Sequence, residues 1–354
     1  MADHIFIARG RGEALKTCGG GGRSGGTAGP FSTLQSKGRT RTGRSYRIIV
    51  IQEAGLDGFW IHRALEAAEI ESHVVDPASI LVPQRKKRAK SDRIDGETLV
   101  RTLMAYKRGD PRVCSMVRPP SPHAEDHRRL VRERRALLTE RVRHTNRIKG
   151  LLFAQGVLDY APLRRDRRAR LEDLQTGDGR TLPQHLKSQI GRELDRLELL
   201  MDQLKAVEAE RDVLLSQRQA KAPVELLLKV KGIGPEFAAV LWTEGFFRHF
   251  DNRRQVAAYA GLAPTPWKSG GIDREQGVSK AGNPRLRCAL VQLSWLWLKH
   301  QPYSALSLWF EARVVQAGGR GRKNAIVALA RKLLVALWKY VNAGVAIEGA
   351  ILAS

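Results

Sequence analysis

Cysteine, acidic residues and long apolar runs are all scarce in this chain of 354 residues. Its three cysteines, Cys18, Cys114 and Cys288, are too few and too scattered to form a disulfide framework or a zinc cluster. No apolar run is long enough to cross a bilayer, and the N-terminus lacks the basic start and apolar core of a signal peptide. These absences predict a cytoplasmic protein with no membrane partner.

The shortage of acidic residues leaves the chain strongly positive. It holds 61 Lys and Arg against 36 Asp and Glu, a formal net charge of +25. Such a field attracts polyanions, and neutralising their phosphates releases counterions. We therefore predict nucleic acid as the partner. Hydrophobic residues make up 42%, and the length allows two folded domains.

The character of the sequence changes near Arg47. Residues 1–46 include a stretch rich in Gly, Arg and Ser, which buries too little surface to offset the entropy of ordering. We expect this segment to be a disordered or degraded leader. Residues 48–51 are apolar and typical of a strand in a parallel sheet; a helix over 58–68 and a second strand at 73–75 then complete a βαβ unit.

Two carboxylates stand three residues apart after a basic loop. Ser91 is a suitable helix cap, so Asp92 and Asp95 should project from one face of the helix that follows. Paired carboxylates repel each other unless a cation lies between them, and Mg²⁺ prefers oxygen ligands of this kind. The alternative is that acidic residues simply suit the positive end of a helix dipole.

The middle of the chain predicts long helices. Residues 122–152 carry many arginines and few acids, which indicates a helix that faces phosphates, with Arg132 and Arg135 among its nucleic-acid contacts. A heptad pattern follows and predicts a coiled coil or hairpin with the preceding helix. Its apolar positions are Ile190, Leu194, Leu197, Met201 and Leu204.

A turn rich in glycine begins the last third of the chain. Residues 230–235 join two apolar helical segments, as in a helix-hairpin-helix. Glycines let a backbone approach a phosphate, so Lys231, Gly232 and Gly234 are candidate nucleic-acid contacts. An ordinary tight connection between helices is the alternative.

A serine within a basic context lies further on. Ser269 precedes two glycines, and Lys280, Arg285 and Arg287 follow within a short distance. A serine hydroxyl is a weak nucleophile unless a base, a metal or nearby cations assist it. Cations at this place could stabilise charge that develops on a phosphoryl group. By itself, a Ser-Gly-Gly sequence is more often only a flexible loop.

Taken together, these motifs are similar to those of a known family. The chain resembles the insertion-sequence transposases of the one-hundred-and-ten family, of the DEDD and serine type, which are related to the pilin-gene inverting recombinases. The resemblance covers about residues 47–345 in the family's order. It rests on residues 53–55, 90–95, 259–264, 269–271 and 280–287.

The resemblance implies a fold of mixed α/β plus α class. A RuvC-like, ribonuclease-H-type domain would span residues 47–120, a basic helical or coiled-coil region 121–220, and a mostly helical transposase domain with the helix-hairpin-helix 221–345, before a tail at 346–354. It also implies DNA as substrate, a structured guide RNA and a homo-oligomer, dimer or tetramer.

The same resemblance assigns roles to residues. Glu53 corresponds to the second carboxylate of a four-carboxylate Mg²⁺ site, Asp92 to the third and Asp95 to the fourth. Ser269 corresponds to the serine that attacks DNA and becomes linked to it. Ser279 is the neighbouring alternative, at a place where the family has either Ser or Thr.

The chain departs from the family at the first carboxylate, which should follow apolar residues within a leading strand. Asp3 lies at about the right distance but precedes its apolar neighbours, and Asp76 matches no family ligand and is interpreted as a turn residue. We therefore expect the first strand to be missing. Three hypotheses remain: a transposase with a serine nucleophile, a metal-dependent nuclease in which water attacks, and an inactive nucleic-acid-binding remnant.

Overall fold

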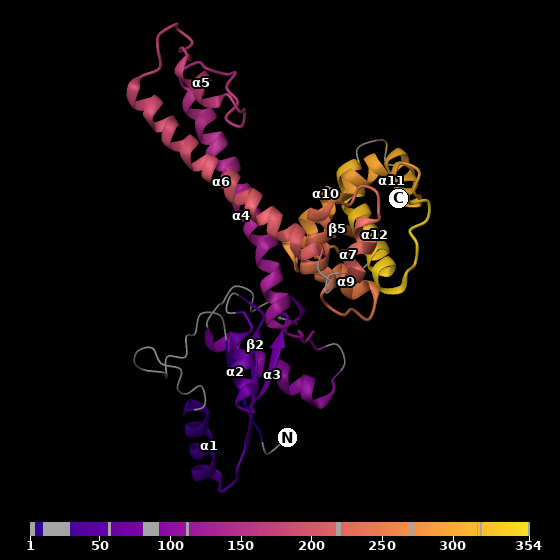
Figure 1. Cartoon of the computed structure of the whole chain (residues 1–354). Helices are drawn as coiled ribbons and strands as arrows, with labels where there is room; N and C mark the ends of the chain where they lie inside the picture. The colour runs from indigo at the N-terminus through magenta and orange to yellow at the C-terminus, as the bar shows by residue number, and fades with distance from the viewer. Residues whose placement is uncertain are drawn as a thin grey trace. The chain divides into compact units, whose positions relative to one another are not determined.

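The computed structural model consists of two compact units, Met1–Pro119 and Pro120–Ser354, which we describe separately (Figure 1). The structure describes residues 4–9, 29–55, 58–80, 92–110, 113–216, 221–269, 272–316, 318 and 321–352. None of the helices in these ranges is both long enough and apolar enough to span a membrane.

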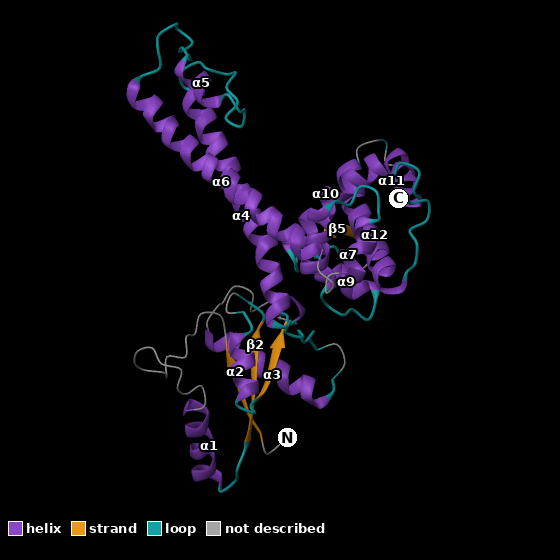
Figure 2. Ribbon diagram, viewed as in Figure 1, coloured by secondary structure: helices purple, strands orange, loops and turns teal. Residues whose placement is uncertain are grey.

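The first unit is built on a parallel three-stranded sheet in the order β1-β2-β3 (Figure 2). Helix α2, Trp60–Ala67, connects β2 to β3, and a short 3₁₀ helix η1, Pro77–Ser79, follows β3. The predicted βαβ unit is therefore confirmed. The strands are β1, His4–Arg9; β2, Arg47–Glu53; and β3, Glu71–Val75.

The start of the chain corrects our expectation that the first strand is missing, whereas the glycine-rich residues 10–28, for which we expected disorder, lie outside the described residues. Strand β1 pairs with β2 along its whole length, from His4 opposite Arg47 to Arg9 opposite Gln52. Helix α1, Gly29–Thr42, follows it, and its Phe31 is buried against the sheet. The apolar run at 5–7, which the sequence analysis treated only as neighbours of Asp3, is sufficient for an additional parallel strand.

The two faces of the sheet have different covers. Ile48 and Val50 of β2 pack with side chains of α1 and α2, whereas Ile49 and Ile51 pack with Leu99 of α3, Asp92–Arg108. Since side chains alternate along a strand, Glu53 lies on the same face of β2 as Ile49 and Ile51. The end of β2 therefore presents its carboxylate to the α3 side of the sheet.

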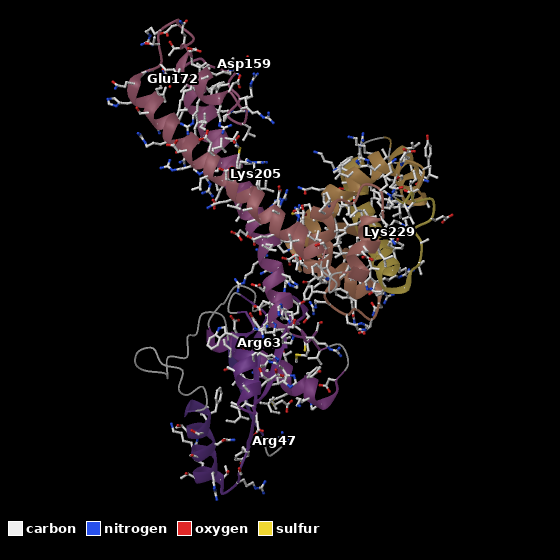
Figure 3. The ribbon with its side chains drawn as sticks, viewed as in Figure 1. Arg47, Arg63, Asp159, Glu172, Lys205 and Lys229 are labelled. Carbon is white, nitrogen blue, oxygen red and sulfur yellow. The ribbon has the colours of Figure 1, made fainter. Side chains whose placement is uncertain are left out.

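The second unit begins with a helical arm, which consists of α4, Pro122–Phe153, the short α5, Arg167–Glu172, and α6, Gln184–Ser216. Ile148 and Leu152 of α4 pack near the beginning of α6, whereas Leu137 packs with residues near its end, so the two helices are antiparallel. The predicted pairing is confirmed, with Ile190, Leu194, Leu197 and Leu204 buried. Charged side chains such as Lys205 and Glu172 cover the outside of the arm (Figure 3).

The rest of the second unit is mostly helical and has one antiparallel hairpin, β4–β5. Its core gathers Leu241, Leu290, Trp297 and Leu333, among others. Because residues 120–354 form one compact unit, the division at residue 220 stays a prediction. The elements are α7, Lys221–Leu228; α8, Pro235–Val240; a π-helix η4, Leu241–Phe246; α9, Arg253–Tyr259; β4, Pro264–Ser269; β5, Ile272–Val278; α10, Pro284–His300; α11, Ala305–Gln316; and α12, Arg322–Ala343.

Candidate functional site

The hairpin β4–β5 carries the two candidate serines at opposite ends. Ser269 is the last residue of β4 and pairs with Ile272, so it lies at the tip. Ser279 lies at the base, where its amide donates a hydrogen bond of 2.9 Å to the carbonyl of Ala263. Strand geometry separates the two by roughly 20 Å. The side chains of residues 266–276 lie outside the described residues, so the attacking role of Ser269 stays a prediction.

The sequence motifs 259–264 and 280–287 cross at the base of this hairpin, and we call this place the crossing. The amide of Asn283 donates to the carbonyl of Tyr259 at 2.7 Å, and the amide of Lys280 donates to that of Gly261 at 3.2 Å. Gly261 and Gly282 have φ of +66° and +120°. A Cβ on Gly261 would lie 2.6 Å from the carbonyl oxygen of Ala281, and one on Gly282 would lie 2.5 Å from that of Tyr259. The motif glycines are therefore required by the close approach of two backbones.

The predicted cations gather where helix α10 begins. The side-chain oxygen of Asn283 caps this helix by accepting from the amides of Arg285, at 3.0 Å, and Leu286. Lys280 and Arg285 are exposed, whereas Arg287 is half-buried and donates to the carbonyl of Lys280 at 2.9 Å. The positive end of the helix dipole adds to these charges. The structure thus brings together the cations that were expected to contact phosphate.

A fully buried carboxylate, that of Glu244, lies beneath the crossing. Its Oε1 accepts from Nε of Arg132 at 2.9 Å, and its Oε2 accepts from Nη2 of Arg128 at 3.2 Å and from Nδ2 of Asn283 at 2.8 Å. Burial alone would raise the pKa of Glu244, but the Arg132 hydrogen bond, the Arg128 charge and the Asn283 hydrogen bond outweigh it and lower the pKa. Glu244 is therefore ionised at neutral pH.

The sequence analysis missed Glu244 and assigned one of its partners to nucleic acid. The signal was present, because Glu244 is a single acid within the apolar run 237–247. Arg132 keeps part of its side chain exposed, but its charge already faces a carboxylate. Arg135 is exposed, and no carboxylate in the described part of the chain pairs with it. Of these two arginines, Arg135 is the one without a carboxylate partner among the described residues, whereas Arg132 shares Glu244 with Arg128.

The glycine-rich turn between α7 and α8 packs against other parts of its own unit. The amide of Lys231 donates to the carbonyl of Ile351 at 3.1 Å, and Nε2 of Gln301 donates to the carbonyl of Lys231 at 2.9 Å. Gly232 has φ of +95°, and a Cβ there would lie 2.9 Å from Cβ of His300. Intramolecular packing therefore accounts for Gly232. Gly234 caps α8, and phosphate contacts of the turn stay a prediction.

The acidic candidates of the first unit lie on elements that face each other. Glu53 ends β2 on the face that α3 covers, and half-buried Asp95 lies one helical turn before the buried Leu99 of α3. The Asp92 side chain, Asp3 and the Ser91 cap lie outside the described residues. Within the described side chains no three potential ligands form a metal cluster, so the site with Glu53, Asp92 and Asp95 stays a prediction.

Comparison with known proteins decides the family. A family model described as transposase IS116/IS110/IS902 family matches residues 224–308. A Sinorhizobium fredii protein that bears the name transposase y4rJ is 68% identical over 336 residues, which is 91% of this chain and 84% of the relative. The chain belongs to the IS110/IS116 family of transposases.

More distant transposases of this kind come from other bacteria. The transposase for insertion sequence element IS1328 of Yersinia enterocolitica is 27% identical over 66% of this chain and 70% of its own length. The transposase for IS1111A of Coxiella burnetii is 25% identical over 82% of this chain and 76% of its own length. The segment that matches the transposase model, 224–308, includes Glu244, the crossing and the whole hairpin.

Proposed function

We propose that this transposase cuts and joins DNA with the hydroxyl of Ser269 as nucleophile. The observation that carries the proposal is the crossing of residues 259–264 with 280–287, which sets the hairpin and the start of α10 side by side. A single rigid base thus supports both the strand that ends at Ser269 and the exposed cations Lys280 and Arg285. Groups fixed in this way are suited to hold DNA phosphates at the base of the hairpin while its tip presents the nucleophile.

The proposed reaction conserves phosphodiester bonds and needs no external energy source. Oγ of Ser269 loses its proton and attacks phosphorus, which forms a phosphoserine ester and releases one DNA end as a hydroxyl. A hydroxyl of a second strand then attacks the same phosphorus, forms the new DNA bond and returns the serine oxygen, which regains a proton. Lys280, Arg285 and Arg287 lie at the base of the hairpin, roughly 20 Å from Ser269, so they would bind other phosphates of the same DNA and hold it in place.

The first unit would supply a metal site in a RuvC-like domain. Glu53 and Asp95 are hard oxygen donors on facing elements, which fits Mg²⁺, and Asp92 would complete the set. A bound Mg²⁺ polarises phosphoryl oxygens and lowers the pKa of a coordinated hydroxyl or water. The role of the three carboxylates is to hold the ion and to orient the DNA at this place.

We further propose DNA together with a structured guide RNA as partners, in a dimer or tetramer. The net charge of +25 supports nucleic acid as the partner. Exposed basic side chains of the arm, such as Arg135, offer phosphate contacts outside the crossing. The parallel strand β1 supplies a first strand, but His4–Arg9 contains no Asp or Glu, so the first carboxylate stays unassigned and the inactive remnant stays the alternative.

Trapping the serine ester tests this function. DNA carrying the element's ends is incubated with the chain, and covalent protein–DNA adducts are separated under denaturing conditions. We expect an adduct with the wild-type chain, none with Ser269→Ala, and an undiminished adduct with the control Ser279→Ala, since alanine at 279 leaves the tip of the hairpin unchanged. Cleavage without an adduct in any of the three would instead support the nuclease in which water attacks.

A further inference from the structure

Glu244 holds together three segments that are far apart in the sequence. Its carboxylate joins Arg128 and Arg132 of α4, its own π-helix η4, and Asn283 at the start of α10. We infer that Glu244 is a positioning residue for strand transfer, which fixes the base of the β4–β5 hairpin and the start of α10. The inference rests on the proposed function, because it concerns the placement of Ser269 and of the phosphate-binding cations.

The burial of Glu244 is difficult to explain by stability alone. Taking the Glu244 carboxylate and the Arg128 guanidinium out of water is costly, and well-packed apolar side chains often stabilise a core as much or more. Arg128 remains incompletely satisfied, because its Nε is buried without a hydrogen-bond partner in the described structure and its guanidinium lies over the ring of Phe247. The cost of burying these charges is better explained if the Glu244 cluster serves to orient the hairpin base and the start of α10.

Asn283 connects Glu244 to the start of α10 and to the crossing. Its Nδ2 donates to Glu244, its Oδ1 accepts from the first amides of α10, and its own amide donates to the carbonyl of Tyr259. A rotation of the Asn283 side chain toward a new partner would break the cap of α10. The backbone amide of the same residue holds the crossing, so the cap of α10 and the base of the hairpin are joined at Asn283.

The π-helix places the carboxylate close to this junction. Wider π turns often occur at functional sites, and η4 has Glu244 and Gly245 next to each other. A Cβ on Gly245 would already lie 3.4 Å from Cδ1 of Leu286, so η4 and α10 pack with little room between them. A displacement of the Glu244 side chain would therefore act directly on α10.

Glu244→Gln tests the inference, with Glu193→Gln as the matched control. Glu193 is also a buried glutamate with basic partners on α4, His144 and Arg147, but helix geometry puts that place roughly 18 Å along α4 from Arg132. The glutamine at 244 would direct an N–H at groups that only donate. We expect its adduct and joined product, per folded molecule, to form about 10²-fold more slowly, as misplaced reacting groups do.

The predicted signature is a separation of chemistry from binding. Glu244→Gln should slow the chemistry far more than it changes DNA affinity, because Lys280 and Arg285 keep their charge. Glu193→Gln should keep the wild-type rate per folded molecule. Folded fractions come from thermal melts of each variant. Equal rates for the wild-type chain and Glu244→Gln would overturn the inference, as would equal losses in the two glutamine variants.

A rescue experiment tests the route through Asn283. Asn283→Asp combined with Glu244→Gln exchanges the carboxylate and the amide, and Asp still caps a helix. We expect the double variant to recover most of the rate that Glu244→Gln loses, whereas Asn283→Asp alone sets two carboxylates against each other and stays slow. If the double variant is no faster than Glu244→Gln, Glu244 does not act through Asn283.

Failure of the inference and failure of the proposed function have different signatures. If the wild-type chain and Ser269→Ala both join DNA without an adduct, the serine chemistry is wrong, and the joined product still measures the effect of Glu244. If no variant joins DNA, amide hydrogen exchange decides the structural claim. Glu244→Gln should speed exchange at Lys280 and Asn283, and Glu193→Gln should not; unchanged protection in Glu244→Gln would overturn it.

Discussion

The helical arm and the hairpin base each contain a buried glutamate that faces cations of α4. In the arm, Glu193 receives hydrogen bonds from Arg147 and Arg196, and His144 lies against its other oxygen. At the hairpin base, Glu244 receives them from Arg128, Arg132 and Asn283. Both carboxyls have a lowered pKa although burial opposes it. The local electrostatics of the two places are therefore alike.

The difference lies in what each glutamate connects. All partners of Glu193 belong to α4 and α6, and its two arginines are about half exposed, at 51% and 55%. Glu244 is fully buried, its partner Arg128 is only 12% exposed, and its third partner caps the helix that carries the phosphate-binding cations. A buried glutamate paired with cations thus joins two helices in the arm, whereas at the hairpin base it also fixes the start of α10.

The largest expected effect comes from placing a Cβ in the crossing. In Gly282→Ala the new Cβ would lie 2.5 Å from the carbonyl of Tyr259 at φ of +120°, so strain and overpacking add. We expect a loss of roughly 2–6 kcal/mol in unfolding free energy and no joined product. Urea titration measures the first and the strand-joining assay the second.

Gly179→Ala is the control in the arm. Gly179 also has a positive φ, +81°, but nothing lies within 4 Å of its future Cβ. The unfolding free energy should therefore fall only by the backbone strain, about 1–3 kcal/mol, and the variant should still join DNA strands. Equal losses in the two alanine variants would show that the tight crossing of the motifs has no special importance.

The next effect is the pH dependence of the two glutamates. The folded-state pKa of each lies below its ordinary value of 4.5, so each stabilises the fold above that value and ceases to do so as the pH falls through the lowered pKa. At pH 7 we expect Glu244→Gln to lose about 3–5 kcal/mol, because Arg128 keeps a buried charge. Glu193→Gln should lose about 1–3 kcal/mol, since its arginines reach water.

Unfolding titrations between pH 7 and pH 3 check this order. Stability of the wild-type chain should fall on acidification, and each glutamine variant should show a flatter acid limb. A wild-type chain whose stability stays constant over this range would contradict paired, ionised carboxylates. A larger loss in Glu193→Gln than in Glu244→Gln would reverse the comparison between the two regions.

Much of the fold could be predicted from patterns with a clear period. The apolar run of β2, the heptads of α6 and the basic helix α4 all appear as their sequences indicate. Strand β1 could not be predicted, because its register depends on β2, some forty residues along the chain, and glycine-rich composition surrounds it. Pairing with a partner that is distant in sequence has no local signal.

The candidate site shows the same limit. The sequence indicated Gly261, Gly282 and the cations of 280–287 as motifs, and the structure brings them together. It gave no indication that Arg132 pairs with Glu244, because the two residues are 112 positions apart. Local spacing reports which residues share a helix face, whereas a buried ion pair depends on how helices pack.

The smallest effect separates two arginines of the same helix face. Arg132 is paired with a buried carboxylate, whereas exposed Arg135 has no such partner among the described residues. If α4 contacts phosphates, Arg135→Ala should lower the slope of log affinity against log salt by about 1 and weaken binding at 50 mM salt.

Arg132→Ala should lower that slope less than Arg135→Ala does, because Arg132 is held by Glu244, a carboxylate that it shares with Arg128. Its effect should appear mainly as a lower unfolding midpoint, since one carboxylate oxygen loses its donor. Filter binding at several salt concentrations measures both slopes. If Arg132→Ala reduces the slope as much as Arg135→Ala, the Glu244 cluster opens when DNA binds. The arginines of α4 would then act as one phosphate-binding surface, rather than as a paired cluster beside an exposed arginine.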